Sequence, residues 1–432
     1  MRDPSGPPGP FRRSFWRSPV RGPWLTSVLG LLLLVGIPVM FATGLLSYAA
    51  YNPDLSPFND TTPGKGLLGF YLFSWPTHPV WLYRLTQGVH VTLGVTLVPI
   101  LLFKLWSVLP KLFEWPPLRS LAHAFERFSL FLVVGGGVFE FATGVVNIQT
   151  WYPFPTSFYT LHFYGAWVFI AGFVIHVTVK FPAMIRALRS RSFIAEMRTN
   201  LANTRPEPPD AGYLAPVAPA APTISRRGVL AFAGAGAALV AALSVGQSLG
   251  GRYRKTALLA PHDQPVTGPG AGTVGDFQIN NTARNAQVNP AETGETWRLT
   301  IATGDQTIHV LSKLSRADLL RMEQHTASLP IACVEGWSTD NQTWTGVRLR
   351  DLAALSGIAS PSTVLVQSLG HGAGFNKAVL SGTQVMDPDS LLALQVNGAD
   401  LSLDHGYPAR VIVPNNPGVH NTKWVSAMIF GS

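Results

Sequence analysis

The sequence predicts a multi-domain protein in which an all-α bundle of transmembrane helices is followed by an α+β, strand-rich domain. Hydrophobic residues make up 47% of the 432 residues and charged residues only 13%, a composition too apolar for an ordinary soluble protein. Long apolar stretches fill the first half of the chain, whereas short alternating segments typical of strands follow Phe277. The single cysteine, Cys333, lies in this second part, so it cannot form a disulfide within the chain.

Membrane helices account for the apolar first half, which we assign as a four-helix membrane domain at 1–198. Each of its four apolar stretches reaches or exceeds the roughly 20 residues that a helix needs to cross a bilayer. These stretches are 24–48, 81–109, 121–146 and 159–179. A fifth transmembrane helix, rich in Gly and Ala, is predicted at 228–249. The Pro- and Ala-rich segment 199–227 is predicted to be a cytoplasmic linker, and 250–275 an external linker.

The distribution of Lys and Arg predicts the orientation of these helices. Positive side chains are enriched before the first stretch, between the second and third, and after the fourth, whereas the intervening loops hold few. Because Lys and Arg accumulate on the cytoplasmic side, we expect a multi-pass protein of the cell membrane with a cytoplasmic N-terminus. Residues 276–432 then lie on the outer side, periplasmic or extracellular. The net charge of +9 reflects this topology, so we expect contact with membrane lipid and no nucleic-acid binding.

A pair of arginines begins the fifth apolar segment. The run SRRGVL at 225–230 resembles a twin-arginine export signal, with Val229 where Phe is usual. As an export signal, Arg226 and Arg227 would direct a domain across the membrane already folded around its cofactor. A double Arg before a membrane helix also satisfies the positive-inside rule without any export role.

Four histidines fall in or at the ends of the predicted helices: His90, His123, His162 and His176. Ionisable residues inside membrane helices are rare and usually functional. His162 and His176 are 14 residues apart, which places them near one helix face and roughly 21 Å apart along the axis. Their depth in the membrane pairs His90 with His162 towards the outer side. It pairs His123, at a helix end, with His176 towards the inner side.

Two facing pairs of imidazoles can supply the axial ligands of two haems stacked across the bilayer. The arrangement resembles the di-haem b-type membrane cytochromes, in which one helix carries two ligands at this spacing. The resemblance implies two haem b groups. Small residues beside the histidines would admit a porphyrin between helices, namely Gly88, Gly94, Gly165 and Gly172. In the alternative, these glycines only tighten helix packing, and the histidines are interhelical hydrogen-bonding groups.

The external domain, 276–432, is predicted to consist of strands and short helices. Apolar, β-branched segments predict strands at 297–301, 363–366, 410–413 and 424–429. Ser315, three residues before Asp318, is typical of a helix N-cap, and another short helix is predicted at 348–355. A domain of this length can form a single core.

Several ordered motifs run through this domain: CVEGWS at 333–338, WTGV at 344–347, HGYPAR at 405–410, VP at 413–414 and GVHNTKW at 418–424. Together they resemble the molybdopterin-binding domain of the sulfite oxidase family, which includes the catalytic subunit of periplasmic methionine sulfoxide reductases. The resemblance implies that Cys333 is the thiolate ligand of molybdenum. It also implies that Arg410, Lys423, His405 and Asn280 hold the pterin and its phosphate. Alternatively, Cys333 is a buried packing residue, and His405 and Arg410 are ordinary loop and strand residues.

Two departures from this family bear on the substrate. His420 stands where sulfite-oxidising relatives usually carry Arg, and 368–377, an expected pocket wall with His371 and Phe375, contains no Arg. Sulfite is an anion that requires cationic side chains, whereas a sulfoxide or N-oxide is neutral. We therefore expect Cys333, His420 and His371 to serve an S- or N-oxide reductase, acting for example on methionine sulfoxide. Sulfite dehydrogenase is the alternative.

These features predict a membrane-bound molybdenum oxidoreductase. Oxygen-atom transfer to or from a small-molecule or protein-bound oxide would occur at an external molybdopterin-molybdenum (Mo-MPT) site. Electrons would pass through the two haems from the quinone/quinol pool or another membrane donor. A hypothesis of another class is a transmembrane electron conduit or sensor whose external domain binds a ligand. A transporter is not favoured, because no inverted repeat or broken helix pair is visible.

Overall fold

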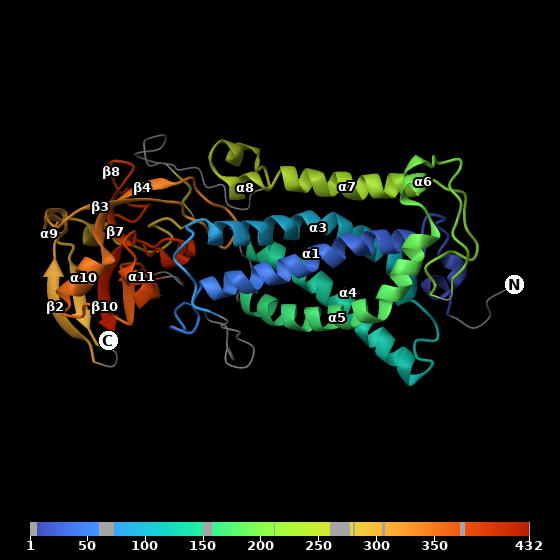
Figure 1. Cartoon of the computed structure of the whole chain (residues 1–432), viewed down its shortest axis with the longest axis horizontal. Coiled ribbons are helices and arrows are strands. Elements are labelled where there is room, and N and C mark those ends of the chain that lie inside the picture. Colours follow the sequence, from blue (N-terminus) through green and yellow to red (C-terminus); the bar gives the residue numbers. More distant parts are fainter. Residues whose placement is uncertain are drawn as a thin grey trace. The chain divides into compact units, whose positions relative to one another are not determined.

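The computed structural model describes residues 7–59, 73–149, 158–210, 212–259, 277–279, 281–304, 307–371 and 376–431. The chain divides into two compact units (Figure 1). The helical unit comprises Met1–Ala42, Thr92–Asn147 and Pro153–Leu243, and the sheet unit comprises Thr43–Val91, Ile148–Tyr152 and Ser244–Ser432. Two long helices pass from one unit into the other, so their segments at 43–50 and 82–91 belong to the sheet unit.

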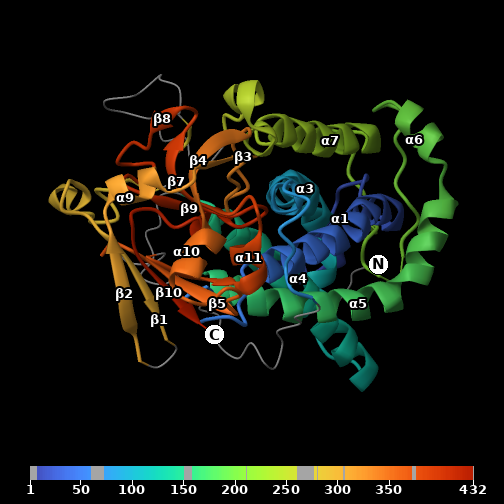
Figure 2. The ribbon, with the colours of Figure 1, turned by 60° about the vertical axis from the view of Figure 1, so that its left-hand side comes forward.

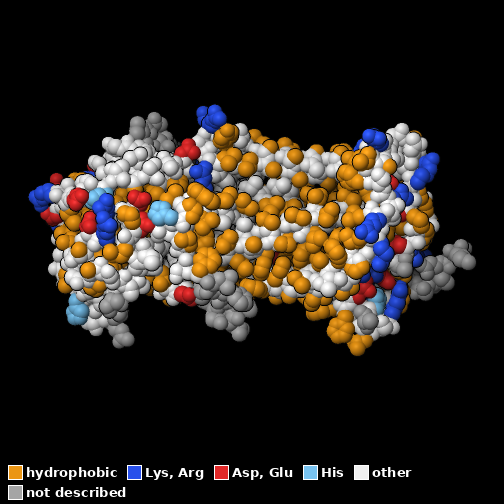
Figure 3. Space-filling model, in the orientation of Figure 1, with side chains coloured by type: hydrophobic (Ala, Val, Ile, Leu, Met, Phe, Trp, Pro, Cys, Tyr) orange, Lys and Arg blue, Asp and Glu red, His pale blue; other side chains and the backbone are white. Residues whose placement is uncertain are grey.

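Five helices of the described chain are long and apolar enough to cross a membrane, which confirms the predicted helical bundle. They are α1 (Pro23–Ala50), α3 (Leu82–Leu112), α4 (Leu121–Asn147), α5 (Tyr159–Ser190) and the span Arg226–Leu249, which comprises α7 (Arg226–Ala242) and the short α8 (Gly246–Leu249). Only 17–28% of the most apolar 18-residue window of each helix is buried inside the structure. Figure 3 shows hydrophobic side chains along the visible face of these helices. Apolar surface of this extent is consistent with a membrane protein.

Glycines allow the helices of the helical unit to approach closely. A Cβ at Gly36 of α1 would lie 2.5 Å from Leu97 of α3, and a Cβ at Gly172 of α5 would lie 2.9 Å from Leu132 of α4. Contacts of this kind are typical of membrane helices, whose association depends on close van der Waals packing. Gly172, one of the glycines expected beside a haem, thus contacts a neighbouring helix.

The segment 199–225 contains no helix or strand among its described residues and belongs to the helical unit. Glu207 is buried and accepts a hydrogen bond of 3.1 Å from the backbone N–H of Trp24 in α1. Arg226, which is 1% exposed, lies 3.4 Å from Glu196 of α6 (Phe193–Arg198) and 3.7 Å from Glu207. The first arginine of the twin-arginine-like run is therefore held in a buried ion-pair cluster.

Two sheets form the strand-rich part of the sheet unit, seen most clearly in Figure 2. The first has the order β2-β1-β10-β5-β6, in which only β1 and β10 are parallel. The second is the antiparallel set β3-β4-β7-β8, with β9 also paired to β7. The strands are β1 (Leu299–Thr303), β2 (His309–Leu314), β3 (His325–Leu329), β4 (Gln342–Arg348), β5 (Thr363–Ser368), β6 (Lys377–Ser381), β7 (Leu391–Val396), β8 (Ala399–Asp400), β9 (Arg410–Ile412) and β10 (Val425–Gly431).

One apolar core joins the two sheets and their short helices α9 (Arg316–Arg321), α10 (Leu349–Leu355) and α11 (Gly382–Met386). Leu299, Val347 and Met428, from three strands, are each fully buried in it. The predicted N-cap is confirmed, because Ser315 and Asp318 form a reciprocal capping box at the start of α9. The fold class is therefore the predicted α+β, strand-rich domain after a helical bundle.

The chain between α1 and α3 packs on the strands through polar side chains. The Asn59 amide donates to and accepts from the backbone of Val379 in β6, with both distances 2.8 Å. Asn415 accepts from the backbone N–H of Tyr83 (2.6 Å) and donates to the carbonyl of Pro76 (2.7 Å). These side chains use backbone hydrogen-bonding groups that would otherwise be unsatisfied.

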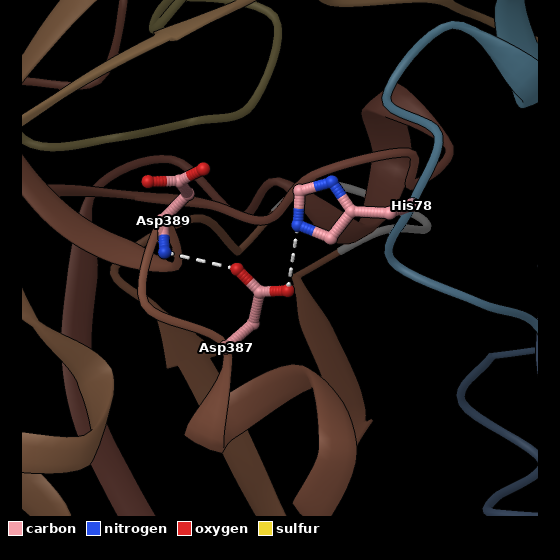
Figure 4. Close-up of side chains that lie close together, drawn as sticks. All are labelled: His78, Asp387 and Asp389. Carbon is pink, nitrogen blue, oxygen red and sulfur yellow. Dashed lines mark hydrogen bonds and ion pairs between the residues drawn. The ribbon is translucent and has the colours of Figure 1, made fainter.

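His78 lies against a buried carboxylate in the same region. Its Nε2 lies 3.2 Å from Oδ2 of Asp387, while Oδ1 of Asp387 accepts from the backbone N–H of Asp389 at 2.9 Å (Figure 4). The His78 side chain is 52% exposed and that of Asp387 is 5% exposed. The buried carboxylate thus holds both its own turn and the loop before α3.

Candidate active site

Cys333 lies in the segment between β3 and β4, in a turn that we call the Cys333 loop (Cys333–Ser338). The backbone N–H of Cys333 donates to the carbonyl of Trp337, and that of Gly336 donates to the carbonyl of Cys333, each at 3.0 Å. Gly336 has φ +84°, a left-handed conformation that favours glycine. The loop buries the cysteine side chain, leaving Cys333 3% exposed.

A cavity of about 90 Å³ lies beside this loop. Four predicted site residues line it together, although they come from separate segments of the chain: Cys333, His405, Arg410 and Lys423. Phe277, Ile279, Trp337, Asp404, Asn421 and Trp424 are among the other lining residues. The predicted pterin ligand Asn280 lies outside the described residues.

Arg410 and Lys423 bring two buried cations to this cavity. Burial lowers the pKa of Arg410 to about 9, and burial followed by the Arg410 charge lowers the pKa of Lys423. Lys423 Nζ donates to the carbonyls of Asn281 and Asp404. Arg410 Nη1 donates to the carbonyl of His405 at 3.3 Å, but its Nε has no hydrogen-bond partner among the described residues. A desolvated guanidinium with an unused donor is suited to an anion such as phosphate.

The surroundings of Cys333 favour a thiolate bound to a metal over a free thiolate. Burial raises the pKa of Cys333, and the charge of Glu335 raises it further. A buried thiol keeps its proton unless a cation compensates the thiolate, and a bound metal supplies that compensation and displaces the proton. Cys333 and Arg410 therefore fit a metal thiolate next to an anionic cofactor.

His405 lines the cavity with its ring nitrogens already engaged. Nε2 lies 2.9 Å from the carbonyl of Phe277, which can only accept, so Nε2 carries the proton. In the neutral ring, Nδ1 then accepts from the hydroxyl of Ser402 at 2.8 Å. The Phe277 ring lies 4.1 Å from the imidazole between ring centroids. His405 thus holds Phe277, which lies outside any helix or strand, at the cavity wall.

His420 lies outside the lining of this cavity, whereas its neighbours Val419 and Asn421 belong to it. The 3-10 turn Gly418–His420 directs the His420 ring elsewhere, edge-on to Tyr51 with 5.3 Å between ring centroids. The residue is 2% exposed, and burial lowers the pKa of His420 to about 4. His420 is therefore a neutral, buried imidazole near neutral pH.

His371 also lies outside the cavity lining, because its side chain is exposed while its backbone N–H donates to the carbonyl of Ala286 at 3.0 Å. Of the expected pocket wall 368–377, Ser368 lines the cavity. Phe375 lies outside the described residues.

The histidines of the helices fall into two groups. In the first, His162 Nδ1 of α5 lies 2.9 Å from the Thr143 hydroxyl and 3.1 Å from a carboxylate oxygen of Glu140, both on α4. The Thr143 hydroxyl donates to the carbonyl of Phe139 at 2.8 Å, so its oxygen accepts from His162. Nδ1 therefore carries the proton, and Nε2 is the unprotonated nitrogen of the neutral ring.

The second histidine of this group, His90 of α3, also lies beside a threonine hydroxyl. Its Nδ1 lies 3.3 Å from the Thr43 hydroxyl of α1, and the following Gly44 faces the ring, since a Cβ there would lie 3.1 Å from Cε1. At His162, Gly144 occupies the equivalent place at 3.3 Å. Both Thr-Gly pairs end a repeated FATG sequence, at 41–44 and 141–144. This repeat is a signal that the histidine spacing alone does not use.

The other two histidines lack this arrangement in the described part of the chain. His123 Nε2 lies 3.7 Å from a carboxylate oxygen of Glu114, and neither ring nitrogen of His123 has a hydrogen-bond partner among the described residues. His176 is half-buried in α5. His162 and His90 thus each lie beside a threonine hydroxyl, whereas no such contact is described for His123 and His176.

Comparison with known proteins identifies the strand-rich domain. Residues 285–432 match the model of the family described as oxidoreductase molybdopterin binding domain. Sulfite oxidase of Arabidopsis thaliana is 32% identical over 112 residues, which are 22% of this chain and 28% of that protein. Nitrate reductase [NADH] of Volvox carteri is 38% identical over 100 residues, 21% of this chain and 12% of that protein. The chain thus spans less than a third of either relative.

Among solved structures, the sulfane dehydrogenase SoxCD of Paracoccus pantotrophus aligns over 32% of this chain and 38% of that chain. The TM-score is 0.27 and the identity 24%, so this likeness supports no conclusion about the chain. The family match and the sulfite oxidase relative agree with the motifs and the cavity. Residues 285–432 thus match an oxidoreductase molybdopterin-binding domain and are similar to the sulfite oxidases, which supports an oxidoreductase.

Proposed function

We propose that this protein is a membrane-bound molybdenum oxidoreductase that couples oxygen-atom transfer in the sheet unit to electron transfer through two b haems. The observation that carries the proposal is the cavity where the thiol of Cys333 meets the buried cations Arg410 and Lys423. When bound there, molybdopterin-molybdenum supplies the two-electron oxygen-atom chemistry that no amino-acid side chain can perform.

The residues of the cavity divide the work of holding this cofactor. Cys333 provides the thiolate for the metal, a soft ligand of the type such sites use. Arg410 and Lys423 provide charge-assisted donors for the pterin phosphate, and each such bond is about twice as strong as a neutral one. His405 positions Phe277 and the cavity wall, because both of its ring nitrogens are engaged within the protein.

The histidines of the helices complete the electron route. A histidine protonated at Nδ1, as His162 is, ligates iron through Nε2, and we assign His90, beside the Thr43 hydroxyl, the same role. His123 and His176 remain the proposed ligands of the inner haem. Gly44 and Gly144 allow the two rings to approach the neighbouring helix, because a Cβ there would lie 3.1 Å and 3.3 Å from Cε1 of His90 and His162. Electrons then come from the quinol pool or another membrane donor.

For the substrate we propose reduction of an S- or N-oxide in preference to oxidation of sulfite. His420 takes the place of the Arg usual in sulfite-oxidising relatives, and its lowered pKa of about 4 leaves it uncharged near neutral pH. It supplies no positive charge for an anionic substrate. A sulfite dehydrogenase that passes electrons to the membrane is the second candidate, since sulfite oxidases are among the relatives.

Metal analysis and assays in both directions test this proposal. We expect molybdenum near one equivalent and two low-spin haems per purified chain, with dimethyl sulfoxide reduced under a quinol analogue. Haem reduction by sulfite, without reduction of dimethyl sulfoxide or methionine sulfoxide, would reverse the direction. Protein that lacks molybdenum but retains its haems would favour the electron conduit or sensor.

A further inference from the structure

The Cys333 loop contacts the segment of α3 that carries His90, and all of these residues belong to the sheet unit. Gln87 Nε2 donates a hydrogen bond to the carbonyl of Val334, the residue next to Cys333. The Val91 side chain packs on Gly336 so closely that a Cβ on Gly336 would lie 2.7 Å from Cβ of Val91. The loop thus meets α3 one residue after His90 and three residues before it.

The other side of the loop is fixed by α8. The Ser248 hydroxyl donates to the carbonyl of Gly336 at 2.6 Å, and the Ser338 hydroxyl donates to the carbonyl of Ser248 at 2.6 Å. The Ser338 backbone N–H donates to the carbonyl of Gln247 at 2.9 Å. The loop is therefore hydrogen-bonded to both α3 and α8. The bonds to α8 keep the loop in contact with α3.

We propose that the Gln87–Val334 hydrogen bond and the Val91–Gly336 contact form the electron path between the molybdenum site at Cys333 and the haem at His90. This inference rests on the proposed function. Electrons tunnel more readily through covalent bonds, hydrogen bonds and van der Waals contacts than across gaps. The path runs from Cys333 through the peptide unit to Val334 and across the hydrogen bond to the Gln87 side chain of α3. Gln87 is less than one helical turn from His90.

The electron balance requires such a path twice in each turnover. Reduction of an S-oxide takes up two electrons and two protons and releases one water molecule. A quinol supplies two electrons and two protons when it is oxidised to the quinone. Because a haem carries one electron at a time, the path at Gln87 and Val91 must pass two single electrons per substrate.

The same contacts could serve only to anchor the loop, so the test separates electron transfer from anchoring. The variants are Gln87→Met and Val91→Ala, with Thr86→Val as the matched control. Thr86 is buried on the same helix, and its hydroxyl donates to the carbonyl of Tyr83 within α3. It has no described contact with the Cys333 loop.

Haems in the purified full-length protein are reduced with a quinol analogue, dimethyl sulfoxide is added, and haem reoxidation is followed by absorbance. Loss of one hydrogen bond changes a docking equilibrium about tenfold, so we expect haem reoxidation in Gln87→Met to slow about tenfold. Turnover with reduced methyl viologen, which delivers electrons to the molybdenum site without the haems, should stay at the wild-type level, as should the haem spectrum. Hydrogen exchange of 334–338 should rise in Gln87→Met.

Unchanged haem reoxidation in Gln87→Met and Val91→Ala would overturn the path, and so would an equal slowing in Thr86→Val. Equal losses of viologen-driven and quinol-driven turnover would assign these contacts to anchoring alone and would also overturn it. Failure of the proposed function looks different, because wild-type protein would then reduce dimethyl sulfoxide with neither donor.

Discussion

The two buried cations of the cavity should have opposite effects on stability and on cofactor retention. Arg410 is 6% exposed, its Nε lacks a hydrogen-bond partner among the described residues, and burial lowers its pKa to about 9. A buried charge without full compensation destabilises the folded state. We therefore predict that Arg410→Met stabilises the cofactor-depleted protein and weakens retention of molybdopterin.

The magnitude follows from the same contacts. Replacing buried charged groups by apolar side chains of similar volume is often stabilising by about 1–4 kcal/mol, and the packing of Arg410 over the Trp344 ring can be kept by Met. Loss of a charge-assisted bond to the phosphate costs about 1.5–3 kcal/mol, which weakens cofactor binding roughly 10- to 100-fold. The sign of the pH effect is fixed, because the folded pKa of Arg410 lies below the unfolded one. Its destabilising effect is complete below pH 9 and lessens as the pH rises above that value.

The assay compares full-length protein purified from a host that cannot make molybdopterin with protein from a host that can. Chemical denaturation of the first gives the change in stability, and pterin fluorescence after oxidation of the second gives the bound cofactor. Arg321→Met is the control, because the 76% exposed Arg321 side chain pairs with the 39% exposed Asp318 and such surface pairs contribute about 0–1 kcal/mol. Lower stability of the depleted Arg410→Met protein, together with a wild-type pterin content, would refute the reasoning.

Three further predictions concern the metal, the outer haem and the buried arginine. A hydroxyl cannot replace a thiolate on molybdenum without changing its electronics, so Cys333→Ser should abolish turnover and leave the haem spectrum intact; retained activity would make Cys333 a packing residue. His162→Ala should remove one haem, whereas Thr143→Val should keep both haems and alter the electron paramagnetic resonance of one, since only ring orientation is lost; an unchanged spectrum in Thr143→Val would show that this hydroxyl does not orient the ligand. Arg226→Met should destabilise the helical unit by about 3–5 kcal/mol, because Glu196 and Glu207 lose a buried partner, while the exposed Arg227→Met should have little effect on thermal unfolding; equal melting temperatures would argue against the ion-pair cluster.

The strands that the sequence predicted are those with a strong apolar or β-branched pattern. β5 and β10 lie in the core of the first sheet and were expected at nearly these positions. By contrast, β2 (HVLSKL) is mostly exposed, and β3 (HTASL) carries three polar residues, so neither pattern stands out. Burial of β7 on both faces depends on its partners β4 and β9, which no local pattern reveals.

The site residues divide in the same way. Motif order indicated Cys333, Arg410 and Lys423, and the fold brings all three to one cavity. Motif order does not predict which way the His420 side chain points. A single 3-10 turn determines whether that side chain faces the cavity or packs against Tyr51. Spacing likewise indicated His162 as a candidate ligand. It could not indicate which ring nitrogen carries the proton, because that depends on the hydroxyl of Thr143 in another helix. Orientation of this kind arises from tertiary contacts.

The contacts of the Cys333 loop restrict position 336 to glycine. On one face, Gly336 meets the Val91 side chain at a distance that excludes any Cβ, and its φ of +84° disfavours other residues independently. On the other face, a Cβ at Gly418 would lie 3.6 Å from Sγ of Cys333. The loop that carries the thiol is thus held between the sheet-unit segment of α3 and the turn that precedes Lys423. A side chain added at position 336 would therefore displace the loop from Val91, and the loop carries both Cys333 and the contact with α3.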